Sequence, residues 1–148
     1  MTFAKVLLRP VGRSRTETQP VRRVDFRLPG GPEAAADARE WLAAVHEPLP
    51  PSLEANVSLL LTELVTNAVR HGGARHGEPV TVTIEHWPGL LRVSVSDPGR
   101  GFRWRPPDPR RPPEEGGYGL VLVDRMARRW GVEPSDDSTT VWFELSPD

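Results

Sequence analysis

The sequence predicts an α+β fold, a two-layer sandwich in which helices cover one face of a mixed, mostly antiparallel sheet. Two observations predict it: long stretches with apolar residues at helical spacing, and several short runs in which apolar and polar residues alternate. The chain has 148 residues, of which 37% are hydrophobic and 26% charged. That length and composition suit one soluble domain with a sizeable core, and we find no internal repeat or domain boundary.

The N-terminal part contains a lead-in, a strand and a helix. Residues 1–23 are basic and show no sustained period, so we expect an irregular segment with one edge strand at 4–8. Residues 24–28 alternate apolar and polar side chains and predict a strand, which a Pro-Gly-Gly run ends. Pro32 then opens an alanine-rich helix that we expect to end near residue 46.

A second helix, from Leu53 to about His71, has the strongest pattern in the chain. Two glycines follow it and are expected to end it. Its apolar residues recur at spacings of three and four and form one wide face: Val57, Leu60, Leu61, Leu64, Val65, Ala68 and Val69. This face is expected to pack on the sheet.

The C-terminal half contains the remaining strands. Two alternating runs, 80–85 and 91–96, are joined by Pro88-Gly89 and predict a hairpin. Residues 140–145 predict a final strand. Between them we expect a helix over 119–130, ended by the glycine that follows, with four residues facing inward: Leu120, Val123, Ala127 and Trp130.

The segment 102–115 fits neither element type. Five of its fourteen residues are proline and seven are charged, so it cannot pair within a sheet or continue a helix. Loops of this length inside a small domain are usually functional or disordered. Because this one lies between two glycine-containing motifs, we expect a lid over a binding site.

Composition excludes several classes of function. The chain has no cysteine, which excludes disulfides, thiolate metal sites and cysteine nucleophiles. Its net charge of −1 gives no reason to expect a direct nucleic-acid or membrane partner, and the basic lead-in is interpreted as a solvated terminus. The apolar runs are too short for a membrane span or a signal peptide, so the expected location is cytoplasmic.

Three local patterns carry candidate chemistry. Glu63 and Asn67 are one helical turn apart, on one side of the predicted second helix. An acid and an amide at this spacing offer oxygen ligands to a hard cation such as Mg²⁺. Taken alone, the pair is better interpreted as a solvated polar pair on the helix surface.

The second pattern is Asp97, at the end of an apolar strand, followed by Gly99 and Gly101. A carboxylate at a strand end can accept hydrogen bonds from an exocyclic amino group such as that of adenine. The glycines lack a Cβ and let the backbone approach a flat ring closely. Taken alone, such a string is usually a turn.

The third pattern is Gly116-Gly117-Tyr118-Gly119, directly before a predicted helix. The first N–H groups of a helix lack partners within the helix and lie at its positive end, which suits phosphate. Taken alone, the pattern is equally consistent with a hinge and helix cap.

The three patterns occur in an order and spacing that resemble the superfamily of gyrase, heat-shock chaperone, histidine kinase and mismatch-repair ATPases. The matching segments are ELVTNAVRHG at 63–72, DPGRGF at 97–102 and GGYGLVLVDRMA at 116–127. The resemblance covers residues 24–146 and implies a histidine-kinase-like ATPase (Bergerat) domain over 24–148. Within the superfamily, the small size, the ELVTNAVRH wording and the VWFEL ending resemble anti-sigma-factor serine kinases of the RsbW type.

The resemblance implies how adenine is bound. Asp97 would bind the adenine amino group, in a slot shaped by Gly99 and Gly101. In the superfamily a threonine on the last strand often supports this carboxylate through water, and Thr139 is the residue that we consider for it.

The resemblance also assigns the phosphate end of ATP. Asn67 would ligate Mg²⁺. Glu63 would be the general base that takes the proton of an attacking serine hydroxyl, or it would orient a water. Backbone N–H groups of Gly117 and Gly119 would bind the phosphates, and Leu120 would open the helix behind them.

The expected function is therefore an ATP- and Mg²⁺-dependent serine/threonine kinase that phosphorylates an anti-anti-sigma protein and sequesters a sigma factor. The alternative is a non-catalytic switch of the same fold, in which ATP gates a protein-binding surface. A homodimer is possible by the same resemblance. Three tryptophans would serve an interface or the core: Trp41, Trp87 and Trp104.

Overall fold

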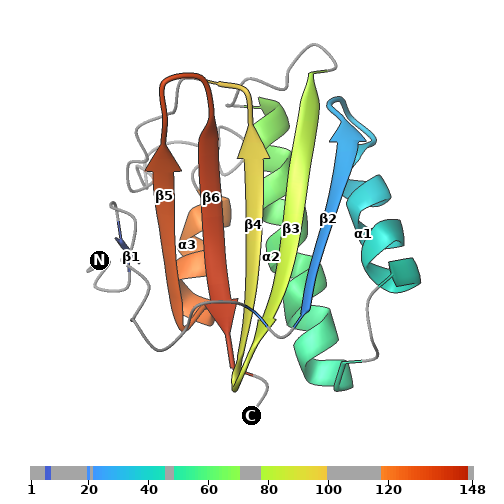
Figure 1. Cartoon of the computed structure of the whole chain (residues 1–148), viewed down its shortest axis with the longest axis vertical. Coiled ribbons are helices and arrows are strands. Elements are labelled where there is room, and N and C mark those ends of the chain that lie inside the picture. Colours follow the sequence, from blue (N-terminus) through green and yellow to red (C-terminus); the bar gives the residue numbers. More distant parts are fainter. Residues whose placement is uncertain are drawn as a thin grey trace.

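The computed structural model describes residues 6–7, 20, 22–45, 49–70, 78–99 and 118–146. These residues form a six-stranded sheet in the order β1-β5-β6-β4-β3-β2, with helices on one face (Figure 1). All neighbouring strands pair antiparallel except β1 and β5, which pair parallel. The predicted class, a mixed and mostly antiparallel sheet in a two-layer sandwich, is confirmed.

The strands and helices follow the sequence periods closely. The strands are β1 Val6–Leu7, β2 Arg22–Pro29, β3 Pro79–Trp87, β4 Leu90–Asp97, β5 Arg129–Pro134 and β6 Thr139–Leu145. The helices are α1 Ala34–Val45, α2 Pro51–Arg70 and α3 Tyr118–Met126. In Figure 1, α2 lies behind β3 and β4, α3 lies behind β5 and β6, and α1 lies beside the β2 edge. None of the described helices combines the length and apolar character needed to cross a membrane.

The core lies between the sheet and the helices. Strand register places the apolar residue of each strand beside that of the next, for example Val82 opposite Val95 and Val93 opposite Phe143. The apolar face of α2 packs on this layer through Leu53, Val57, Leu60, Leu61, Leu64, Val65 and Ala68, all buried. Burial of such side chains contributes about 1.5–3 kcal/mol each, which makes α2 the main helical support of the domain.

The turn predicted between β3 and β4 is confirmed. Trp87 pairs with Leu90 across Pro88-Gly89. Gly89 has a φ of 69°, in the left-handed region that favours glycine. The tight turn fixes the register of β4, which brings Asp97 to the far end of that strand.

The prediction of one helix over 119–130 is wrong in its second half. Helix α3 ends at Met126, and Arg129–Pro134 forms strand β5. Trp130 is buried as expected, but it faces the helices from a strand, where it pairs with Phe143 of β6. The β5–β6 hairpin supplies a ladder of backbone hydrogen bonds, and this non-local pairing outweighs the local helical spacing.

The N-terminal edge strand is confirmed at Val6–Leu7, beside β5. The predicted lid at 102–115 lies outside the described residues, and so does Trp104. Trp41 is 44% exposed and stacks on Phe26 with ring centroids 5.5 Å apart. Trp87, by contrast, is buried, so it is not the exposed aromatic residue that the interface alternative requires.

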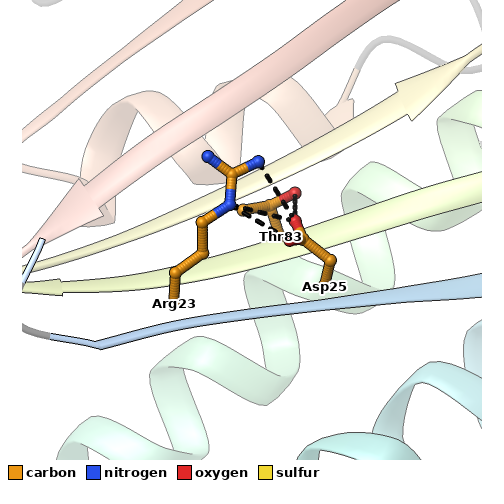
Figure 2. A network of polar contacts seen from close by, with 3 residues as sticks. All are labelled: Arg23, Asp25 and Thr83. Atoms are coloured by element: carbon orange, nitrogen blue, oxygen red, sulfur yellow. Dashed lines mark hydrogen bonds and ion pairs between the residues drawn. The ribbon is translucent and has the colours of Figure 1, made fainter. Parts of the chain in front are cut away.

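The sheet face away from the helices is largely polar. Arg23 and Asp25 of β2 and Thr83 of β3 form a hydrogen-bonded network there (Figure 2). The Arg23 Nε lies 3.1 Å from Asp25 Oδ2, and the Thr83 hydroxyl donates to Asp25 Oδ1 at 2.6 Å. These hydrogen bonds, that of Arg23 first, lower the pKa of Asp25 from its ordinary 3.8.

Candidate functional site

Asp97 is a buried carboxylate at the end of β4, with 4% of its surface exposed. The backbone N–H of Gly99 donates to its Oδ1 at 2.8 Å. An aspartate side chain commonly bonds the backbone two residues on and so closes a turn. Burial of an ionised carboxylate is costly unless hydrogen bonds compensate it, so the turn and the charge support each other.

Thr139 holds the other side of the same turn. It begins β6, directly opposite Asp97 in the β4–β6 register, and its side chain is buried. Its hydroxyl donates to the carbonyl oxygen of Gly99 at 3.2 Å. The N–H and the carbonyl of Gly99 are therefore held by two neighbouring strands, which gives this glycine a defined position at the sheet end.

Glu63 and Asn67 lie on α2, one turn apart, and both side chains are half-buried. They border the apolar face, next to the buried Leu60 and Leu64. Helix α2 packs against both β4 and α3. The helix that carries the acid–amide pair thus contacts both the strand that ends in the carboxylate and the helix of the third pattern.

Figure 1 shows how these elements are directed. The C-terminal half of α2, the end of β4 and the start of β6 lie toward the same end of the molecule. Helix α3 runs the other way and leads into β5 at the opposite end, so its first residues are its nearest part to the Asp97 end. The helix N-terminus is therefore directed to the side on which the carboxylate lies.

Only some residues of the third pattern lie within the part of the chain that the structure describes. Helix α3 begins at Tyr118, one residue before the predicted start, so Gly119 lies in its first turn, and Leu120 is buried in the core. The first N–H groups of a helix have no partner within it and attract anions. Gly101 and Gly117 lie outside the described residues.

One buried polar contact was not predicted. The indole Nε1 of Trp130 donates to Oδ1 of Asp124 at 2.9 Å, linking β5 to α3. Trp130 is fully buried and Asp124 is 9% exposed. The sequence signal was an acid in the middle of an otherwise apolar helix, Leu-Val-Leu-Val-Asp, which we interpreted simply as part of the motif.

A cavity of about 370 Å³ is lined by residues of α1, of α2 and of the segment before α1. Its lining residues are Gly31, Pro32, Ala35, Thr66, Val69 and Arg70. None of the predicted site residues that the structure describes lines it. We therefore do not assign the predicted chemistry to this cavity.

The residues fit a nucleotide better than a protein-bound metal centre. Within the described ranges, no group of three or more His, Cys, Asp or Glu side chains could hold a metal ion. Mg²⁺ typically takes one or two protein oxygens and completes its shell with phosphates and water. The side-chain oxygen of Asn67, at the border of the apolar face of α2, could be one of these protein ligands.

The chain is similar to known proteins in sequence. A family model described as histidine kinase-like ATPase domain matches residues 28–145. An uncharacterized protein of Streptomyces coelicolor is 39% identical over 94 residues, which are 57% of this chain and 79% of that protein.

A solved structure is also similar, the histidine kinase domain from the Erythrobacter litoralis EL346 blue-light activated histidine kinase. Its identity to the chain is 28% and its TM-score is 0.47, over 66% of this chain and 46% of that one. The chain thus spans less than half the length of that kinase.

Proposed function

The chain belongs to the histidine kinase-like ATPase domain family, and we propose that it is a serine/threonine kinase that regulates a sigma factor. Membership of the family makes it an ATP-binding regulatory protein. The finer proposal is that it transfers the γ-phosphoryl group of ATP to a serine of an anti-anti-sigma protein. It would also bind and sequester the sigma factor.

The observation that supports nucleotide binding best is the turn at the end of β4. Asp97 is buried, in register with Thr139, and both side chains hold the peptide groups of Gly99. A buried carboxylate beside a glycine without Cβ matches the donor pattern and the flat shape of adenine. A site that hydrogen-bonds an exocyclic amino group discriminates strongly against bases that lack it.

The phosphate end would be held by α2 and α3. The first turn of α3, which contains Gly119, offers N–H groups to phosphate oxygens, and Asn67 offers one oxygen to Mg²⁺. Bound Mg²⁺ would neutralise charge on the phosphates. Catalysis of this type depends on positioning and charge stabilisation, so rigid elements suit it.

Glu63 is the proposed general base. It lies one turn before Asn67 on the same side of α2, half-buried. It would take the proton of the serine hydroxyl while that oxygen forms a bond to the γ-phosphorus and the bond to the β–γ bridging oxygen breaks. ADP leaves with the electron pair of that bond, and the serine carries the phosphate.

The test is transfer of label from γ-labelled ATP to a candidate anti-anti-sigma protein. Wild type should label a serine, and Glu63→Gln should bind ATP normally but lose transfer by at least about a hundredfold, the usual contribution of a general base. The matched control is Glu54→Gln, an exposed acid in the first turn of the same helix, which should transfer like wild type.

The alternative is the ATP-gated binding switch. If ATP binds tightly, no antagonist is labelled, and partner binding still depends on ATP, the kinase proposal is overturned and the switch replaces it. If neither ATP binding nor labelling occurs, both proposals fail.

A further inference from the structure

The contact between Asp124 and Trp130 joins the two elements that follow the second glycine motif. Asp124 belongs to α3, and Trp130 belongs to β5, where it faces the helices. The indole N–H donates to the carboxylate at 2.9 Å in a buried environment. Helix and sheet are thus linked by a directional bond as well as by apolar packing.

The carboxylate is a costly choice at this position. Burial of a carboxylate is strongly unfavourable, and a neutral indole N–H supplies one hydrogen bond but no opposite charge. An apolar residue of similar size would pack against the tryptophan at lower cost. The presence of a polar pair is better explained by a role in fixing the geometry of α3 than by a role in stability.

Apolar packing restrains the rotation of α3 with less directional preference than a hydrogen bond does. The buried side chains Leu120, Val123 and Ala127 hold the helix on the core, but dispersion contacts have little directional preference. A hydrogen bond prefers an angle above about 150° and weakens steeply below about 120°. The Asp124 bond therefore fixes the rotation of α3 about its own axis.

A second bond fixes the chain just beyond the helix. The N–H of Arg128 donates to the carbonyl of Glu144 in β6 at 2.8 Å. Both attachments lie in or after the last turn of α3, and a short helix moves as a rigid body. Asp124 lies six residues after Tyr118, about 9 Å along the axis, so a tilt of about 10° would move the first turn by about 1.5 Å.

From this geometry we infer that Asp124 and Trp130 are a positioning pair for phosphate binding. Their hydrogen bond holds the N-terminal turn of α3 where its N–H groups meet the phosphates of ATP, an inference that rests on the proposed function. Neither residue is among those that we propose for adenine. Its loss should weaken binding of the phosphates and leave binding of the nucleoside unchanged.

The experiment compares ATP with adenosine on the full chain, by titration followed with NMR so that weak binding is measurable. Asp124→Leu and Trp130→Phe each remove the bond and should lower ATP affinity about tenfold, the scale expected for a displacement of about 1 Å or more. Adenosine affinity should stay within about twofold of wild type, because the adenine slot is untouched. A purely structural defect would lower both affinities together.

Two matched controls separate the bond from the bulk of the side chains. Asp124→Asn keeps an oxygen that accepts the indole N–H and should retain wild-type ATP affinity. Trp142→Phe makes the same change as Trp130→Phe on the neighbouring strand, where the buried indole Nε1 has no hydrogen-bond partner among the described residues. It should leave the ratio of ATP to adenosine affinity unchanged.

The outcomes distinguish this inference from the proposed function. If wild type does not bind ATP, the proposed function fails and the inference fails with it. If wild type binds ATP but Asp124→Leu and Trp130→Phe keep the wild-type ratio of affinities, only the positioning role is overturned. Loss of ATP binding in Asp124→Asn equal to that in Asp124→Leu would also overturn it.

Discussion

The hydroxyl of Thr139 donates to the carbonyl oxygen of Gly99 at 3.2 Å, across the adjoining ends of β6 and β4. The two residues are far apart in sequence and meet because the β4–β6 register sets Thr139 opposite Asp97. Gly99 in turn donates its N–H to Asp97. A contact within the sheet thus fixes the turn on which the proposed adenine site depends.

Thr139→Val should therefore weaken nucleotide binding. The substitution keeps the shape of the side chain and removes the hydroxyl, which leaves the Gly99 carbonyl without this donor. We expect a loss of about 1 kcal/mol in unfolding free energy and a similar loss in ATP binding. Calorimetric titration and denaturant unfolding measure both. Thr139→Ser, which retains the hydroxyl, should behave like wild type, and equal ATP binding by Thr139→Val would contradict this role.

Asp25 should make a small, pH-dependent contribution to stability. Its pKa in the fold is lowered from 3.8, first by the hydrogen bond from Arg23 and then by that from Thr83. A lowered folded pKa stabilises the fold above the unfolded pKa, and this contribution is lost as the pH falls through the folded value. Because both side chains are about half exposed, we expect about 0.5 kcal/mol.

Urea unfolding of wild type and Asp25→Asn at pH 7 and near pH 3 measures this effect. The stability difference at pH 7 should shrink at the lower pH. The hydrogen bond to Asp25 raises the pKa of Arg23, so the charge of Arg23 is present throughout this range and does not change the comparison. A stability difference that grows on acidification would contradict the assignment.

The buried carboxylate of Glu144 is stabilised by an ion pair with Arg129. The carboxylate is 2% exposed, and its Oε1 lies 2.8 Å from the Arg129 guanidinium. Arg129→Met should leave a buried charge without this partner and lower the unfolding free energy by about 2–3 kcal/mol, since half of the arginine side chain is solvated. The double variant Arg129→Met/Glu144→Met should be more stable than the single one, and thermal unfolding compares them.

The sequence patterns predict those parts of the fold in which local and global preferences agree. The apolar face of α2 and the alternation in β3 and β4 each have one period and one way to be buried. Gly89 fits only a tight turn, so the hairpin register follows from it. Asp97 could be placed at a strand end for the same reason.

The α3–β5 boundary shows where local patterns are insufficient. Leu120, Val123, Ala127 and Trp130 fit helical spacing, yet Trp130 and Val132 also fit the alternation of a strand. Pairing with β6 decides between the two, and that contact is not written in the local sequence. The polar run between Pro134 and Thr139 was the overlooked signal, because it is typical of a hairpin turn.

The candidate site divides in the same way. The places of Glu63, Asn67 and Asp97 in the fold could be predicted from the motifs, because each residue lies on a regular helix or strand. The bonds from Thr139 to Gly99 and from Trp130 to Asp124 could not, because both depend on which strands become neighbours.

The central claim is that one adenine nucleotide binds where the end of β4 meets α2 and α3. ATP titration of wild type and Asp97→Asn, with Mg²⁺ present, tests it most directly. Wild type should bind, and Asp97→Asn should lose at least about tenfold in affinity, because the amide no longer offers the same charged acceptor to the adenine amino group. Equal ATP affinity in a folded Asp97→Asn variant would contradict the claim.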